Sequence, residues 1–196
     1  MLASDRHRLV DAFQFALEAH GDQIRKGSKT PYASHLIQVA GMVLENDGDA
    51  TQAVAALLHD ALEDCEAVDE PSLRSRFGDE VADIVVACSD LLPGDTPKSK
   101  SPWDERKRRY LARIEGADLR VQLVAACDKL HNLRSLIGDL RADGRETLSR
   151  FNATPEQTRW YYERARQAAG GALCEAARCE FDELLVALRA FVPGNP

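Results

Sequence analysis

The sequence of 196 residues has no excess of positive charge: 25 lysines and arginines stand against 32 aspartates and glutamates, a formal net charge of −7 at pH 7. General binding to nucleic acid needs a broad basic surface, and this balance argues against it. The sequence also lacks a run of the roughly 20 apolar residues that a membrane-spanning helix needs, and no apolar signal core follows its first residues. We therefore expect a cytoplasmic protein that binds neither nucleic acid nor a membrane.

Cysteine is sparse as well, with five residues and no Cys-x-x-Cys pair. An odd number of cysteines without that spacing predicts free, buried thiols rather than a disulfide framework. The spacing of Cys174 and Cys179 is a poor match to zinc motifs. We expect no disulfide and no metal bound through cysteine.

No segment alternates apolar and polar residues as a half-buried strand does. Apolar residues instead recur at helical spacing in almost every segment. The hydrophobic fraction of 44% is enough for a sizeable core, so the sequence predicts an all-α fold. The expected helices cover residues 5–20, 35–46, 50–64, 71–77, 80–91, 104–114, 119–141, 155–169 and 173–191, with caps at Ser4 or Asp5 and at Ser34.

The length suits one domain, which we expect over residues 1–196, with a core at about 5–167 and a C-terminal helix at 170–192. The longest polar gap runs from Leu92 to Trp103 and holds three prolines and a glycine. The helical pattern resumes directly after it. We therefore interpret this gap as a mobile loop within the domain rather than a boundary.

The most unusual stretch is His59-Asp60-Ala61-Leu62-Glu63-Asp64, which directly follows an apolar run. If the helix continues through it, His59 lies over Glu63 and Asp60 lies over Asp64, because residues four apart share a face. Burying charged groups is costly unless a metal, partner cations or water compensates them. The stretch therefore predicts a metal site that handles phosphate.

A second signal is Asp128, which interrupts an otherwise apolar pattern in the middle of a long predicted helix. A buried acid of this kind needs a metal or a cation as its partner. An ion pair with Lys129 or Arg134 is the alternative. Adjacent residues do not face one another on a helix, which disfavours Lys129.

Histidine at position 35 stands at the start of a predicted helix, where a lone histidine is more often a surface or capping residue than a ligand. Combined with the two preceding signals, it completes a mixed set of nitrogen and oxygen donors. Such a set suits a borderline divalent ion such as Mn²⁺, Fe²⁺ or Zn²⁺. The set is His35, His59, Asp60 and Asp128.

The order of these residues resembles that of the HD-domain metal phosphohydrolases. The sequence is most similar to the (p)ppGpp hydrolases of the Rel/SpoT type and their stand-alone small alarmone hydrolases, including the metazoan SpoT homologues. The resemblance implies a helical bundle with the metal site in its centre and, in so short a chain, a hydrolase-only form. The matching stretches are Ala19 to Gln23, Arg25 to Gly27, Pro31 to His35, Ala55 to Asp64, Glu105 to Arg108, Asp128 to Arg134 and Trp160 to Tyr162.

The resemblance also implies a role for each candidate residue. His35, His59, Asp60 and Asp128 would hold one Mn²⁺, with Fe²⁺ or Zn²⁺ as alternatives, and Glu63 with Asp64 would orient and activate the attacking water. The implied nucleotide contacts are Arg25 and Lys26 at the purine, Asn132 near the 3′ position, Lys107 with Arg106 at the phosphates, and Tyr161 at the border of the nucleotide. Arg108 and Arg109 are expected to be surface charges.

The implied reaction is hydrolysis of the 3′-pyrophosphate of (p)ppGpp, which leaves GDP or GTP and pyrophosphate. The partner is then a small nucleotide, and the oligomeric state, monomer or homodimer, stays open. One alternative is a related phosphohydrolase that acts on (p)ppApp, NADPH or another phosphorylated nucleotide. Another is a metal- or nucleotide-binding sensor without turnover, against which the Glu63–Asp64 pair argues.

Two positions and one segment depart from the family pattern. Cys65 and Cys127 replace small residues that are common there, and both are small enough to leave the metal set intact. The segment from Thr154 to Arg159 does not align well with the purine-side helix of the best-known members. The choice between guanine and adenine is therefore left open.

Overall fold

The computed structural model describes residues 2–193, so Met1 and residues 194–196 of the expected single domain lie outside the described range. The described residues form helices and no strand beyond two isolated bridges, which confirms the predicted all-α fold class. The α-helices are α1 (Ala3–His20), α2 (Ala33–Glu45), α3 (Ala50–Leu58), α4 (Ala61–Asp64), α5 (Glu70–Phe77), α6 (Asp79–Cys88), α7 (Trp103–Glu115), α8 (Leu119–Asp143), α9 (Pro155–Ala169) and α10 (Glu175–Phe191). Two short 3-10 helices, η1 (Arg145–Arg150) and η2 (Gly170–Ala172), were not expected from the sequence.

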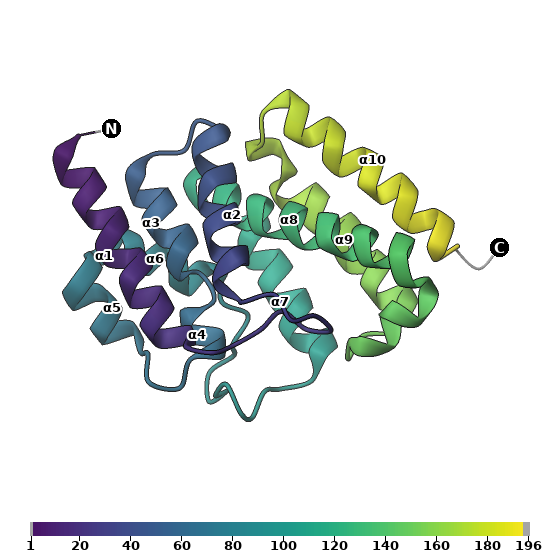
Figure 1. Cartoon of the computed structure of the whole chain (residues 1–196), viewed down its shortest axis with the longest axis horizontal. Coiled ribbons are helices and arrows are strands. Elements are labelled where there is room, and N and C mark those ends of the chain that lie inside the picture. Colours follow the sequence, from purple (N-terminus) through teal and green to yellow (C-terminus); the bar gives the residue numbers. More distant parts are fainter. Residues whose placement is uncertain (1, 194–196) are drawn as a thin grey trace.

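The long helix α8 runs through the middle of the molecule (Figure 1). On one side it packs against α2, α3 and α6, and on the other side against α9 and α10. α1 covers α3, and α7 packs against α6 and α9. The middle of α8 therefore lies where the two groups of helices meet. None of the described helices is long and apolar enough to span a membrane.

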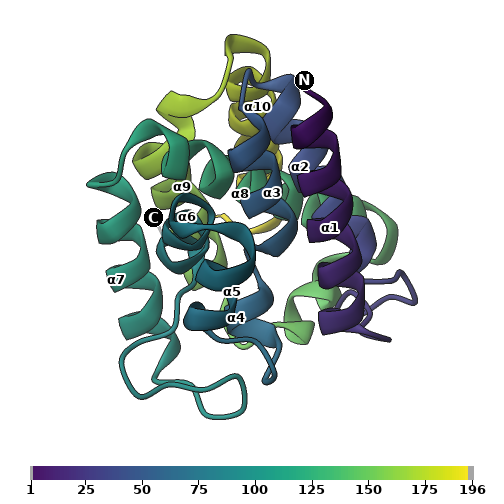
Figure 2. The same ribbon diagram turned by 90° about the vertical axis from the view of Figure 1, so that its left-hand side faces the viewer.

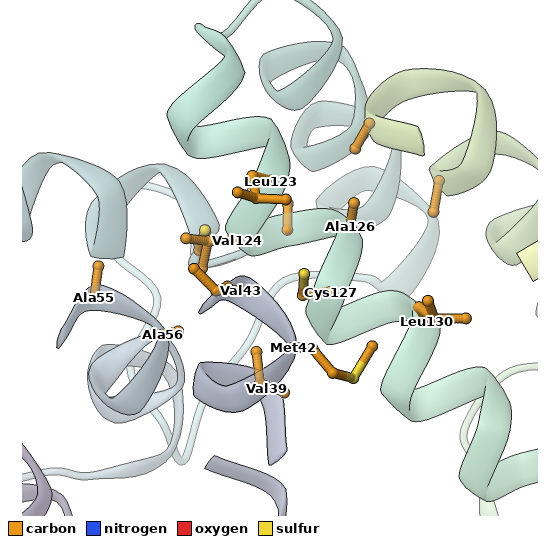
Figure 3. Close-up of a cluster of buried hydrophobic side chains, with 14 of the residues drawn as sticks. Val39, Met42, Val43, Ala55, Ala56, Leu123, Val124, Ala126, Cys127 and Leu130 are labelled. Atoms are coloured by element: carbon orange, nitrogen blue, oxygen red, sulfur yellow. The ribbon is translucent and has the colours of Figure 1, made fainter. Parts of the chain in front are cut away.

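A seam of small and branched side chains joins α2, α3 and α8 (Figure 3). Seven of its labelled members have 0% of their surface exposed: Val39, Val43, Ala55, Ala56, Val124, Cys127 and Leu130. Fully buried protein interiors are densely packed and tolerate little change in side-chain volume. An added methylene group there lowers the free energy of unfolding by about 1–3 kcal/mol. The seam therefore fixes the end of α3 relative to the middle of α8, and these are the two places from which most of the predicted ligands arise.

The expectation of one continuous helix from residue 50 through Asp64 was wrong. α3 ends at Leu58, His59 and Asp60 form a turn, and α4 begins at Ala61. The last carbonyls of a helix lack partners within it, and the His59 Nδ1–H satisfies one of them by donating to the Ala56 oxygen at 2.7 Å. His59 therefore caps the end of α3, and the turn directs His59 and Asp60 toward the centre of the fold.

Two predicted helix caps were also wrong. α2 begins at Ala33 rather than after Ser34, and the Ser34 hydroxyl instead accepts a bond from Gln38 at 3.0 Å. α1 begins at Ala3, so Asp5 lies in its first turn and accepts from the Leu2 amide at 2.9 Å. A first-turn carboxylate satisfies a free amide there, as a cap would, so the helix starts earlier than the sequence pattern predicted.

All five cysteines are free thiols. Cys65, Cys88 and Cys127 are buried as expected, and burial raises the pKa of each to about 12, so none carries a reactive thiolate. Cys174 and Cys179 are exposed, so the expectation of burial was wrong for these two. They lie at the start of α10, whose buried face is formed by other residues.

Candidate active site

A cavity of about 840 Å³ opens between α2, α4, α7, α8 and α9. Seven of its lining residues are cationic, namely Arg25, Lys26, Lys100, Arg106, Lys107, Lys129 and Arg134. Five are acidic, namely Asp60, Glu63, Asp64, Asp128 and Asp139. The cavity therefore has a local excess of two positive charges in a chain whose net charge is −7. Such an excess favours an anionic ligand.

Four predicted ligand atoms converge at the buried side of this cavity. His35 Nε2 lies 3.3 Å from His59 Nε2 and 3.3 Å from Asp128 Oδ1. His59 Nε2 lies 3.0 Å from Asp60 Oδ2. An ion with bonds of about 2.0–2.2 Å holds neighbouring ligand atoms roughly 3.0–3.6 Å apart. The spacing of these atoms therefore fits a first-row divalent ion.

The four residues do not form one uniform set. His35, His59 and Asp128 form a compact group in which the ligand atoms all lie within 4.8 Å of one another. Asp60 stands outside that group but approaches its two imidazoles, since its Oδ2 lies 3.4 Å from His35 Nε2 and 3.0 Å from His59 Nε2. The donor set thus has a three-residue centre with Asp60 beside it.

Both histidines of the donor set are oriented through their other ring nitrogen. His59 Nδ1 is occupied by the Ala56 oxygen, and His35 Nδ1 lies 2.8 Å from His131 Nδ1. Burial lowers the pKa of His131 to about 4, so this ring is neutral. In the His35 tautomer that carries its hydrogen on Nδ1, His35 donates to His131 Nδ1. Hydrogen bonds at Nδ1 leave both Nε2 atoms free for a metal. The sequence interpretation missed this role of His131, whose only signal was its place beside Asp128 and Asn132.

The charge of Asp128 is balanced within the protein. Burial opposes its ionisation, but the Lys129 and His59 charges outweigh burial and hold the pKa of this carboxyl well below its ordinary value. Lys129 Nζ contacts Asp128 Oδ2, so the argument against this adjacent pair was wrong. A lysine stem is long enough to curl back to its neighbour. Arg134 pairs instead with Glu180, at 2.7 Å.

The predicted catalytic pair lies next to this centre, at the end of α4. The Tyr32 hydroxyl lies 2.6 Å from Asp60 Oδ2 and 3.2 Å from Asp64 Oδ2, so it bridges the donor set and the pair. Burial and the nearby charges of Asp60 and Glu63 raise the pKa of Asp64 to about 6. A carboxylate with this pKa is a stronger base near neutral pH than an ordinary aspartate. The sequence indicates Tyr32 only as part of a matching stretch and predicts no contact for its hydroxyl.

Cations from α7 and from the preceding loop lie beside the acidic pair and form the opposite wall together with it. Arg106 and Lys107 both contact Asp90, whose surface is only 2% exposed. The fixed carboxylate therefore holds the two cations in place. Lys100, from the polar gap in the sequence, lies 3.1 Å from Glu63 Oε1 and 3.6 Å from Asp64 Oδ1. No pattern in the sequence distinguishes Lys100 as a site residue.

The five predicted nucleotide contacts, Arg25, Lys26, Lys107, Asn132 and Tyr161, all line the cavity. Arg25 donates to Asn132 Oδ1 at 2.7 Å, and Lys26 Nζ lies 5.6 Å from the Phe151 ring centroid. Lys107 Nζ lies 5.1 Å from the ring centroid of Tyr161. The cavity lining therefore brings together residues that lie far apart along the chain and that the family resemblance implies as nucleotide contacts.

Arg108 and Arg109 do not line this cavity. Arg108 lies over the ring of Trp160, 4.9 Å from its centroid, and Arg109 pairs with Glu105 at 3.4 Å in an exposed pair. Exposed pairs of this kind contribute little to stability. Both residues are surface charges, as expected from the sequence.

Comparison with known proteins gives a consistent result. A model of the HD domain family matches residues 12–152. The chain is 35% identical over 137 residues to the GTP pyrophosphokinase rsh of Brucella ovis, a match that covers 70% of this chain and 18% of that protein. It is 34% identical over 143 residues to the bifunctional (p)ppGpp synthase/hydrolase SpoT of Escherichia coli K12, which covers 73% of this chain and 20% of that protein. The chain thus spans about a fifth of the length of these curated relatives.

Among solved structures, a metazoan ortholog of SpoT that is described as hydrolysing ppGpp matches almost the whole chain. The two are 27% identical, with a TM-score of 0.71 over 91% of this chain and 94% of that one. The similarity therefore extends beyond the region matched by the family model, toward the C-terminal helices.

Proposed function

The chain belongs to the HD domain family, and we propose that it removes the 3′-pyrophosphate from guanosine alarmones, converting (p)ppGpp to GDP or GTP and pyrophosphate. The observation that carries this proposal is the meeting of three groups in one cavity. A compact donor set, an acidic pair and an excess of cations all line it or border it. A binding protein without turnover needs no acidic pair beside its metal ligands, so the arrangement favours an enzyme.

The ion that we propose is a single Mn²⁺, held by His35, His59, Asp60 and Asp128. Two imidazole nitrogens with two carboxylate oxygens suit Mn²⁺, Fe²⁺ and Zn²⁺ better than Mg²⁺ or Ca²⁺, which prefer oxygen alone. When bound, the ion would neutralise charge on the reacting phosphate and lower the pKa of a water molecule. The hydrogen bonds at the Nδ1 atoms of both histidines support this assignment, because they leave the Nε2 atoms free for coordination.

We assign Glu63 and Asp64 to the attacking water. In the reaction, the water oxygen bonds to the phosphorus that carries the ribose 3′ oxygen, and the bond from that phosphorus to the 3′ oxygen breaks. One water proton passes to the acidic pair, and the 3′ oxygen takes up a proton and leaves as a hydroxyl. The raised pKa of Asp64, about 6, supports its role as the proton acceptor. General-base catalysis of this kind contributes about 10²–10⁴-fold.

The remaining wall residues are assigned to the nucleotide. Arg25 is held by Asn132, and Lys107 is held by Asp90, so neither side chain has to be ordered when the ligand binds. Groups that are positioned in advance lower the entropic cost of binding. Lys26 offers a positive charge to a purine, and the neighbouring Phe151 offers the face of its ring. Tyr161 borders the same space. The single-domain boundaries, the cytoplasmic location and the oligomeric state stay predictions.

A substrate panel tests the proposal. Purified protein supplied with Mn²⁺ is assayed for release of pyrophosphate or phosphate from ppGpp, ppApp and NADPH. We expect pyrophosphate from ppGpp at the highest kcat/KM of the three. The absence of pyrophosphate release from ppGpp, or a preference for NADPH or ppApp, would contradict the assignment to guanosine alarmones.

A further inference from the structure

The loop between α6 and α7, residues 89–102, brings a lysine to the catalytic pair. The loop lies at the lower end of the molecule, beneath α7 and α4 (Figure 2). The side chain of Lys100 is only 22% exposed, and its Nζ lies 3.1 Å from Glu63 Oε1 and 3.6 Å from Asp64 Oδ1. One cation from a loop thus contacts both carboxylates of the pair.

The loop holds this lysine in place through its own hydrogen bonds. The Asp95 carboxylate accepts from the Leu92 amide at 3.0 Å, from the Ser101 amide at 2.9 Å and from the Ser101 hydroxyl at 2.6 Å. Arg106 of α7 donates to the Ser101 oxygen at 3.1 Å. Ser101 directly follows Lys100, so these bonds fix the backbone beside the lysine.

Lys100 differs from the other cations nearby in its choice of partner. Lys107 contacts Asp90 and Lys129 contacts Asp128, and neither of these acids belongs to the catalytic pair. Arg106 also contacts Asp90 and lies 3.9 Å from Glu63 Oε1, so it reaches one carboxylate of the pair. Of these four cations, Lys100 is the one that contacts both carboxylates of the pair. A cation that stays on the pair competes for the lone pairs that a water molecule needs. Lys100 therefore has to leave the two carboxylates and pair with another anion when the substrate binds.

The two oxygens of Asp64 show where that anion would lie. Its Oδ2 faces Tyr32, which also bonds Asp60 of the donor set, whereas its Oδ1 faces Lys100. The pair therefore lies between the donor set and the lysine. A phosphate that reacts at the pair extends its next phosphate away from the donor set, toward the side on which Lys100 lies.

We propose that Lys100 binds the distal phosphate of the substrate's 3′-diphosphate and, in the free protein, pairs with Glu63 and Asp64. This inference rests on the proposed function and refines it. Lysine suits the exchange because its charge stands on a flexible four-carbon stem, which can turn from the carboxylates to a phosphate while the loop backbone stays fixed. Lys100 then selects a 3′-diphosphate over a 3′-monophosphate.

The same loop offers a matched control. Lys98 lies two residues before Lys100, pairs with Glu66 at 2.6 Å, has a side chain that is 79% exposed and does not line the cavity. Lys98→Met and Lys100→Met remove the same charge from the same loop and keep a similar length. Lys100→Arg keeps the charge. Their affinities for inorganic pyrophosphate and inorganic phosphate are measured by calorimetry on full-length protein loaded with Mn²⁺ and freed of excess metal.

We expect Lys100→Met to weaken pyrophosphate binding about tenfold, as loss of a charge-assisted hydrogen bond does, and to change phosphate binding far less. Lys98→Met should bind both anions as the unchanged protein does, and Lys100→Arg should retain most of the affinity. Wild-type pyrophosphate affinity in Lys100→Met would overturn the proposal. An equal loss for phosphate and pyrophosphate would overturn it as well.

A kinetic arm tests the selection between substrates. The ratio of kcat/KM for ppGpp to that for guanosine 5′-diphosphate 3′-monophosphate should fall about tenfold in Lys100→Met and stay unchanged in Lys98→Met. An unchanged ratio in Lys100→Met would contradict the distal-phosphate contact. If the unchanged protein fails to hydrolyse ppGpp, the proposed function fails, and the two anion affinities still decide the role of Lys100.

Discussion

The two sides of the cavity are built in different ways. The donor set lies at the start of α2, in the turn that directly follows α3 and in the middle of α8, where Asp128 is only 3% exposed. The opposite wall, with Glu63, Asp64 and Lys100, lies on a four-residue helix and a loop, and ion pairs hold it together. Packing therefore fixes the donor set, while charge balance fixes the wall.

This difference suits two tasks. Metal ligands have to keep their spacing within a few tenths of an ångström, and helices packed through a dense core provide that rigidity. Residues that exchange a proton or a phosphate have to change partners during a reaction. Ion pairs on short, partly exposed elements can be exchanged at little cost. Substitutions on the two sides should therefore have separable effects.

The largest expected effect comes from the donor set. Asp128→Asn removes a proposed ligand and leaves Lys129 without its partner, so metal and activity should be lost together, with metal affinity lowered by more than about 100-fold. The metal content is measured by elemental analysis and the activity by pyrophosphate release. Asp139→Asn is the control, because Asp139 lies on the same helix, lines the same cavity and has Arg150 as its partner at 3.8 Å. Full metal content in Asp128→Asn would exclude it as a ligand.

A smaller effect is expected one hydrogen bond away from the donor set. His131→Phe keeps a ring at this position but removes the acceptor of the His35 Nδ1 hydrogen. Loss of such a partner lowers metal affinity about 10–100-fold. His131→Asn, which retains an acceptor, should recover part of it. If both variants bind Mn²⁺ with wild-type affinity in a competition assay with a chelator, His131 does not orient His35.

The smallest effect is a shift in pH dependence on the other wall. Asp64 has a pKa raised to about 6 and accepts a proton only when ionised, so kcat/KM should fall as the pH is lowered through about 6. An ordinary aspartate, with a pKa of 3.8, would keep its activity to a much lower pH. Lys100 lowers the pKa of Asp64, so Lys100→Met should move this fall to higher pH, and Lys98→Met should leave it in place. A fall centred near pH 4 in the unchanged protein would contradict the role of Asp64.

The same division explains what could be predicted from the sequence. Asp128 stood out because a carboxylate in an apolar helix is costly, and its place in the buried centre follows from the same fact. Lys100 could not be distinguished from Lys98, because both stand in a polar loop and only the fold brings one of them to Glu63. The break at His59 and Asp60 also escaped prediction, since the residues before and after it fit one helical pattern.

The double variant Glu63→Gln with Asp64→Asn tests most directly whether the metal and the water are handled by separate groups. Elemental analysis and pyrophosphate release from ppGpp are measured on the same preparation. We predict metal content equal to that of the unchanged protein, with turnover lowered about 10²–10⁴-fold. Loss of metal from the double variant, or turnover at the rate of the unchanged protein, would contradict this division between the donor set and the opposite wall.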